Sequence, residues 1–168
     1  MKVYDTQFNA NEWYFLLLLL GGLIIMIKLP KQFSLAKAIT YFTLGSYLGM
    51  LLDHTISVEP FNFYDVNDTS NYSVFDFISY LAYGPSSFLF IYIYNRFQLK
   101  GFQILFYIVI WSLGGMCLEG IGHLLGAYHY LNGYKFLYSF PFYLSLKVFT
   151  ICFYHLLTYF EGKWRAGT

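Results

Sequence analysis

The chain has 168 residues, of which 58% are hydrophobic and only 11% are charged. Because soluble domains carry roughly 25% charged residues, this composition excludes a water-soluble globular protein and indicates a chain embedded in lipid. The formal net charge of +1 gives no overall field that would attract nucleic acid, and the length predicts a single domain.

A transmembrane helix needs about 20 mainly apolar residues to cross a hydrocarbon core of about 30 Å. Five segments meet or nearly meet this requirement. In chain order, the predicted spans are residues 12–29, 35–56, 74–97, 102–127 and 138–160. The sequence therefore predicts an all-α, polytopic membrane bundle of about five transmembrane helices, with residues 1–168 as its single domain.

The first predicted span is expected to be retained rather than cleaved as a signal peptide. Lys2, Asp5 and Glu12 precede its apolar run in place of a basic region, and no small-x-small cleavage site follows Ile27. A four-span bundle with a peripheral first helix is the alternative. It is disfavoured because the fifteen uncharged residues after Glu12 have no polar face.

The positive charges near the spans are distributed unevenly, and Lys and Arg collect on the cytoplasmic side of a membrane. With five spans, seven of the ten cations share one side: Lys28, Lys31, Lys37, Arg96, Lys100, Lys163 and Arg165. The other side has Lys2 and Lys135, together with the acids Asp5, Glu12, Glu59, Asp65 and Asp68. We therefore expect the N-terminus outside and the C-terminus in the cytoplasm.

Two pairs of glycines spaced four residues apart, Gly45 with Gly49 and Gly122 with Gly126, are typical of close helix contacts in lipid. We expect them to support packing within the chain, with homodimerisation as the alternative. Cys117 and Cys152 fall in apolar runs, and we expect small buried side chains there. The sequence does not decide whether the two cysteines form a disulfide.

Six ionisable residues stand out within the predicted spans, where a charge near the centre costs at least about 2.5–3.5 kcal/mol and therefore faces protein or water. The predicted topology places all six in the outer half of the bilayer. This candidate polar cluster consists of Asp53, His54, Asp76, Glu119, His123 and Lys147.

Glu119 and Lys147 have similar predicted depths, roughly 12 and 13 Å at a rise of about 1.5 Å per residue, so we expect a buried ion pair. Glu119 and His123 are four residues apart and share one helical face. This pair indicates either a proton-relay or cation site or, as we favour, a polar staple that fixes helix register. With no paired ligand signature at hand, we expect no metal.

The remaining members of the cluster have simpler interpretations. Asp53 and His54 are consistent with ordinary interfacial residues near the end of a span. Asp76 is consistent with an acid that favours the N-terminal end of the helix dipole.

Two stretches of scattered aromatic and acidic positions resemble a family of small uncharacterised membrane proteins of spore-forming bacteria such as bacilli and clostridia. They cover roughly the last two-thirds of the chain. The first carries Tyr64, Asp65, Asp68, Asp76, Tyr80, Tyr83, Pro85, Ile91, Tyr92 and Tyr94. The second carries Trp111, Ser112, Glu119, Tyr130, Gly133, Tyr134, Lys135, Tyr138, Ser139 and Tyr143. The resemblance implies a bacterial cell membrane and adds weight to Asp65, Asp76 and Glu119.

These patterns favour a non-catalytic envelope component over two alternatives. One alternative is binding or transport of a small solute or ion through the cluster around Glu119, His123 and Lys147. The other is a membrane enzyme with Glu119 and His123 as acid and base. A cavity that reaches Glu119 would favour the alternatives, whereas a dry bundle with Glu119 paired to Lys147 would favour the envelope role.

We expect no catalytic residues, no cofactor and no nucleic-acid partner. The lipid bilayer is the expected partner, with another membrane protein or a second copy of the chain as further candidates.

Overall fold

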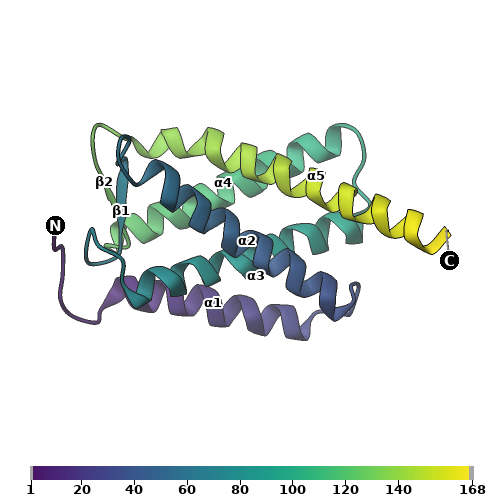
Figure 1. Cartoon of the computed structure of the whole chain (residues 1–168), viewed down its shortest axis with the longest axis horizontal. Helices are drawn as coiled ribbons and strands as arrows, with labels where there is room; N and C mark the ends of the chain where they lie inside the picture. The colour runs from purple at the N-terminus through teal and green to yellow at the C-terminus, as the bar shows by residue number, and fades with distance from the viewer. Residues whose placement is uncertain (1, 167–168) are drawn as a thin grey trace.

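Each predicted span forms one helix in the computed structural model, which describes residues 2–166 apart from the side chains of Arg165 and Ala166. The helices are α1 (Ala10–Lys28), α2 (Leu35–Ile56), α3 (Val74–Phe97), α4 (Phe102–Leu124) and α5 (Ser139–Ala166). They run along one common axis, and all are long and apolar enough to cross a membrane (Figure 1). The prediction of an all-α, multi-pass membrane bundle is confirmed.

Capping boxes explain where two of the helices begin. In α1, the Glu12 carboxylate accepts a hydrogen bond from the Asn9 backbone N–H at 2.7 Å, and the Asn9 side chain caps the helix in return. This capping box starts α1 at Ala10, two residues before the predicted start. Ser73 and Asp76 form the same motif at the start of α3. Asp76 is thus a helix-capping acid.

The fourth helix ends earlier than predicted because the chain reverses at a glycine. Gly126 has a φ of +82°, which an L side chain adopts only with strain. The backbone N–H of Ala127 then donates to the Gly122 carbonyl at 2.8 Å, which satisfies one of the last carbonyls of α4. Residues 125–127 therefore form a turn, and α4 stops at Leu124.

A small sheet that the sequence did not predict covers one end of the bundle. Strands β1 (Tyr64–Val66) and β2 (Tyr128–Tyr130) pair antiparallel, with Tyr64 opposite Tyr130. The N-terminal segment lies against it, since the Tyr4 hydroxyl donates to Asp65 at 2.7 Å and the Tyr4 ring stacks on His129 at 3.6 Å. We call residues 2–9, 57–73 and 125–138 the cap, and this side of the bundle the cap end (Figure 1).

Helix α3 packs closely against both α1 and α2, while α4 packs mainly against α5. Glycines make the close contacts possible. A Cβ atom on Gly22 would meet the Pro85 ring at 2.4 Å, and one on Gly49 would meet the Tyr83 ring at 2.3 Å. A Cβ atom on Gly45 would lie 2.6 Å from the Tyr83 carbonyl oxygen. The prediction that Gly45 and Gly49 support packing within the chain is confirmed.

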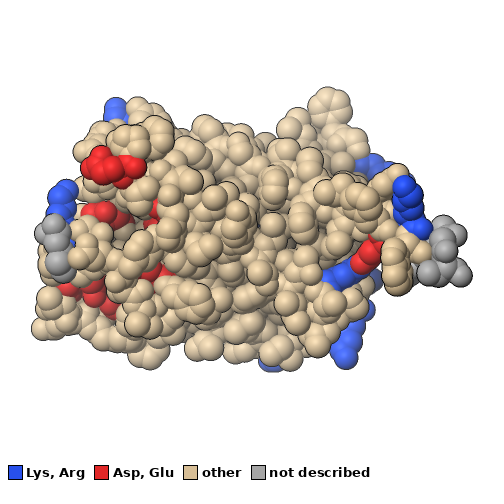
Figure 2. Space-filling model, viewed as in Figure 1, with Lys and Arg blue, Asp and Glu red and all other residues tan. Residues whose placement is uncertain are grey.

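Charged residues separate between the two ends of the bundle. Acids gather at the cap end, whereas most Lys and Arg side chains in view gather at the opposite end (Figure 2). At the opposite end, Lys37 of α2 forms an ion pair with Glu161 of α5. The side chain of Arg165, one of the seven cations assigned to this end, lies outside the described part of the structure.

The two cysteines are free thiols on the exposed surface of the helices, so the prediction that they are buried is wrong. The physical reason is the solvent. Lipid is as apolar as a protein core, and an apolar run therefore does not reveal which of its residues face inward.

Replacing Gly45 with alanine should weaken the contact between α2 and α3. The new methyl group would meet the Tyr83 backbone and Ser87 Cβ, neither of which is a flexible side-chain end. We expect Gly45→Ala to destabilise the fold by about 1–3 kcal/mol, measured by thermal unfolding in detergent.

Gly162→Ala in α5 is the matched control, because no described residue lies within 4 Å of a Cβ atom there. We expect it to be stabilising by about 0.5–1 kcal/mol through helix propensity. Equal melting temperatures for the two variants would contradict the close packing of α2 on α3.

Candidate functional site

A cavity of about 510 Å³ lies among the five helices. Its walls include Tyr64 and Tyr130 of the cap at one end and Trp111, Lys147 and Thr150 deeper in the bundle. The volume falls within the range of about 300–1,000 Å³ that is typical of small-molecule sites. Most of the lining is apolar or aromatic, with a few polar groups, as in such sites.

Glu119 of α4 faces this cavity and is held by two hydroxyl groups. Its Oε1 accepts hydrogen bonds from the Tyr130 hydroxyl at 2.7 Å and from Ser139 Oγ at 2.6 Å. Burial raises the pKa of Tyr130 well above its usual range, and the hydrogen bond to Glu119 raises it further. Tyr130 therefore stays protonated and remains a donor. Ser139 is the first residue of α5, so the Glu119 carboxylate joins α4, α5 and β2.

Lys147 of α5 faces the same cavity at a deeper level. Its ammonium nitrogen lies 5.0 Å from the centre of the Phe90 ring and 5.7 Å from that of Trp111. Both rings offer the negative face of their π-systems to the cation, a contact worth up to about 2 kcal/mol when desolvated.

The ion pair predicted between Glu119 and Lys147 is not formed. Among the described residues, the ion pair within 4.0 Å joins Lys37 and Glu161 instead. Ser139, which contacts Glu119, and Lys147 are eight residues apart on α5, or about 12 Å at 1.5 Å per residue. The predicted depths agreed only because α4 was expected to continue to Ala127, which the turn at Gly126 prevents.

Asp53 and Asp76 belong to a separate network that fastens residues 57–73 to the helices. Asp53 is buried and accepts hydrogen bonds from the Tyr80 hydroxyl and from Ser57 Oγ. Asp76 accepts one from Asn67 Nδ2 at 2.7 Å. These contacts hold the cap in place and do not line the large cavity.

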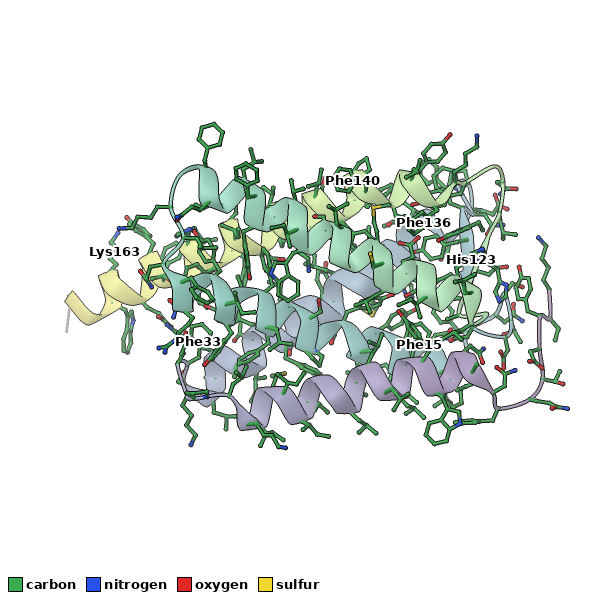
Figure 3. All side chains as sticks on the ribbon, turned by 180° about the vertical axis from the view of Figure 1, so that it is seen from behind. Phe15, Phe33, His123, Phe136, Phe140 and Lys163 are labelled. Atoms are coloured by element: carbon green, nitrogen blue, oxygen red, sulfur yellow. The ribbon has the colours of Figure 1, made fainter. Side chains whose placement is uncertain are left out.

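The two histidines of the candidate polar cluster also lie outside the cavity. His54 is exposed and bonded through Nε2 to the Tyr72 hydroxyl at 2.5 Å. His123 is exposed at the cap end of α4 (Figure 3), where Nδ1 donates to the Tyr128 carbonyl at 2.7 Å. Its ring stacks on Tyr130 at 4.5 Å. His123 and Glu119 thus share Tyr130 as a neighbour without contributing to one site.

Tyrosines, none of which belonged to the predicted polar cluster, form much of the cavity wall. The seven that line it are Tyr14, Tyr64, Tyr83, Tyr128, Tyr130, Tyr134 and Tyr143. The Tyr83 and Tyr128 hydroxyls are 2.5 Å apart, and the Tyr14 hydroxyl donates to the Leu118 carbonyl at 2.8 Å. The density of tyrosines between residues 128 and 143, directly after Glu119, is a sequence signal that could have indicated a tyrosine-lined site.

One polar group of the cavity wall lacks a hydrogen-bond partner in the described part of the chain. Ser87 of α3 lines the cavity and is buried, yet its Oγ has no hydrogen-bond partner among the described residues. Buried hydroxyls are nearly always satisfied, so Ser87 offers a hydrogen bond to an occupant of the cavity. Ser87 precedes Phe90 by one helical turn and is therefore close in depth to the Lys147 ammonium group.

Within residues 2–166, no group of three or more His, Cys, Asp or Glu side chains is placed to hold a metal ion. Comparisons of the chain with protein-family models, with curated proteins and with solved structures find no match.

The separation of Glu119 from Lys147 can be tested with a double-mutant cycle of Glu119→Gln and Lys147→Met. We expect Glu119→Gln to destabilise by about 1–3 kcal/mol, because two hydroxyls lose a charged acceptor. Lys147→Met should be neutral or stabilising, and the coupling energy should stay below about 0.5 kcal/mol. Thermal unfolding of the four proteins measures all three quantities.

Lys28→Met is the control, because it also removes one positive charge but does so at the end of α1, outside the cavity. A buried ion pair would give the opposite pattern, with a loss of about 3–5 kcal/mol for each single variant and recovery in the double variant.

Proposed function

We propose that this protein binds a small, mostly apolar molecule that carries an anionic group, and that it holds this molecule in the cavity between its helices. The observation that carries the proposal is the position of Lys147. Its ammonium group lies in the cavity against two aromatic rings, with no carboxylate among the described residues within 4.0 Å. A cation in so apolar a setting is strongly stabilised by an anion.

The two charged groups of the cavity, Glu119 and Lys147, differ in whether the described residues supply them with polar partners. Glu119 already accepts hydrogen bonds from Tyr130 and Ser139. Among the described residues, neither Lys147 nor the Ser87 hydroxyl has a hydrogen-bond acceptor or a carboxylate partner, so both remain available as donors. These facts support an occupant whose anionic group lies at the deep end and whose apolar part contacts the aromatic walls.

The same observations favour binding over the role of a purely structural envelope component. A bundle with only a structural role needs no cavity of about 510 Å³ at its centre, and it would gain stability by filling that volume. It would also gain by pairing or replacing Lys147.

We infer in addition that the protein lies in a bacterial plasma membrane with its N-terminus outside and its C-terminus in the cytoplasm. Supporting this orientation, Lys28, Lys37, Arg96 and Lys163 belong to helix ends opposite the cap. The cap itself is rich in acids. The positive-inside rule assigns the cation-rich end to the cytoplasm. The resemblance to membrane proteins of spore-forming bacteria supports the choice of membrane.

Binding can be measured through Trp111, which lines the cavity, once the exposed Trp13 and Trp164 are replaced by phenylalanine. Bromine quenches indole fluorescence on contact, so a dibrominated stearic acid is a suitable anionic probe. We expect saturable quenching of Trp111 by the acid, with an affinity about tenfold higher than for its uncharged methyl ester, equivalent to about 1.4 kcal/mol.

Lys147→Met should remove most of this preference for the acid, while Lys28→Met, outside the cavity, should retain it. The proposal fails if the acid does not quench Trp111 saturably, or if the acid and the ester bind equally well to the parent protein.

The orientation can be tested with reporters fused to the C-terminus. A cytoplasmic C-terminus gives a fluorescent green-fluorescent-protein fusion and an inactive alkaline-phosphatase fusion, because the phosphatase matures only outside the plasma membrane. An active phosphatase fusion together with a non-fluorescent green-fluorescent-protein fusion would place the C-terminus outside and reverse the proposed orientation. A fusion after residue 33, between α1 and α2, should give the same result as the C-terminal fusion.

A further inference from the structure

From the exposure of its lining residues, we place the lipid-facing side of the cavity between α1 and α4. Its lining residues come from all five helices, but the exposed ones belong to α1 and α4 alone. They are Leu17 (65% exposed), Ile25 (48%) and Leu118 (41%), together with Gly114. The lining residues of α2, α3, α5 and the cap are buried or half-buried.

Two glycines make this opening. Gly21 lies between Leu17 and Ile25 at intervals of four residues, so the three share one face of α1. Nothing lies within 4 Å of a Cβ atom built on Gly21 or on Gly114. This differs from Gly22, Gly45 and Gly49, where a neighbouring helix fills the corresponding space. Gly21 and Gly114 therefore leave free space that the packing of the bundle does not use.

The opening lies within the apolar band of the helices. Leu17 to Ile25 covers about 12 Å along α1, between Glu12 near one end and Lys28 at the other. At the cap end, the opening is closed by the Tyr14 hydroxyl, which donates to the Leu118 carbonyl and ties α1 to α4. The opening thus faces acyl chains rather than water.

The route from water through the cap is covered. Tyr83 and Tyr128 meet through their hydroxyls at 2.5 Å, and Tyr134 bonds to Ser139 at 3.0 Å above Glu119. Strands β1 and β2 lie across the same end. A ligand arriving from water would have to displace these contacts, whereas one arriving from the bilayer meets the open faces of Gly21 and Gly114.

We propose that the ligand is a single-chain anionic lipid that enters from the bilayer through the opening between α1 and α4, and that its anionic group then contacts Lys147. This rests on the proposed function and names its substrate class and route. A single chain fits because a cavity of about 510 Å³ suits a drug-sized ligand, and a two-chain phospholipid is larger. The exposed Leu17 and Ile25 allow the end of a longer chain to stay in contact with the bilayer.

The test follows the kinetics of Trp111 quenching by the dibrominated stearic acid in nanodiscs, with Gly21→Phe and Gly114→Phe as variants that narrow the opening. We expect each variant to slow both association and dissociation at least about fivefold, because the same barrier is crossed in both directions. Gly162→Phe is the control, since its site is equally free of neighbours but lies outside the cavity, and it should leave both rates unchanged.

A short brominated carboxylate that stays in water completes the test, and it should not quench Trp111 saturably. Unchanged rates in both narrowed variants, with Lys147-dependent binding retained, would overturn the route and leave the proposed function standing. Faster dissociation would also overturn the route, because it would make Gly21 and Gly114 part of the binding surface. If the acid quenches Trp111 equally well in the parent protein and in Lys147→Met, the proposed function is instead overturned.

Discussion

The close approach of α3 to α1 and α2 is the constraint on which the rest of the structure depends. Gly22 receives the Pro85 ring, and Gly49 receives the Tyr83 ring. In lipid, where no hydrophobic force drives helices together, such van der Waals contact between small residues and neighbouring helices is what holds them. Helix α3 makes most of its contacts with α1 and α2 and fewer with α5, and α4 packs mainly on α5. The cavity is the space left between these two groups of helices.

The cavity has opposite polar character at its two ends. Toward the cap, hydroxyl groups from Tyr130 and Ser139 satisfy the Glu119 carboxylate, which explains how an acid persists at this depth. At the deep end, the Lys147 ammonium group lies against the faces of Phe90 and Trp111. A fold selected for stability alone would pair these charges with each other. Lys147 lies about 12 Å along α5 from Ser139, which holds Glu119, and the cavity between them has ends that recognise different chemical groups.

Part of this arrangement follows from patterns that any reader of the sequence can find. The five apolar segments, the polar residues that cap α1 and α3, and the uneven distribution of Lys and Arg are local or periodic features. Glycine spacing likewise indicated which faces of α2 approach a neighbour. The cap escaped prediction because β1 and β2 are short and pair across a separation of more than sixty residues. Neither strand has a partner nearby in the chain that would reveal it.

The sequence by itself determined that this protein is a five-helix membrane bundle, because the bilayer imposes a length and an apolarity that each span must meet independently. Only the tertiary structure decided which polar residues meet. Lipid and protein interior are equally apolar, so hydrophobicity cannot tell an inward face from an outward one. For that reason the tertiary structure was needed to show that Cys117 and Cys152 face outward and that Glu119 bonds to hydroxyls. It was also needed to show that Lys147 lines a cavity among the helices.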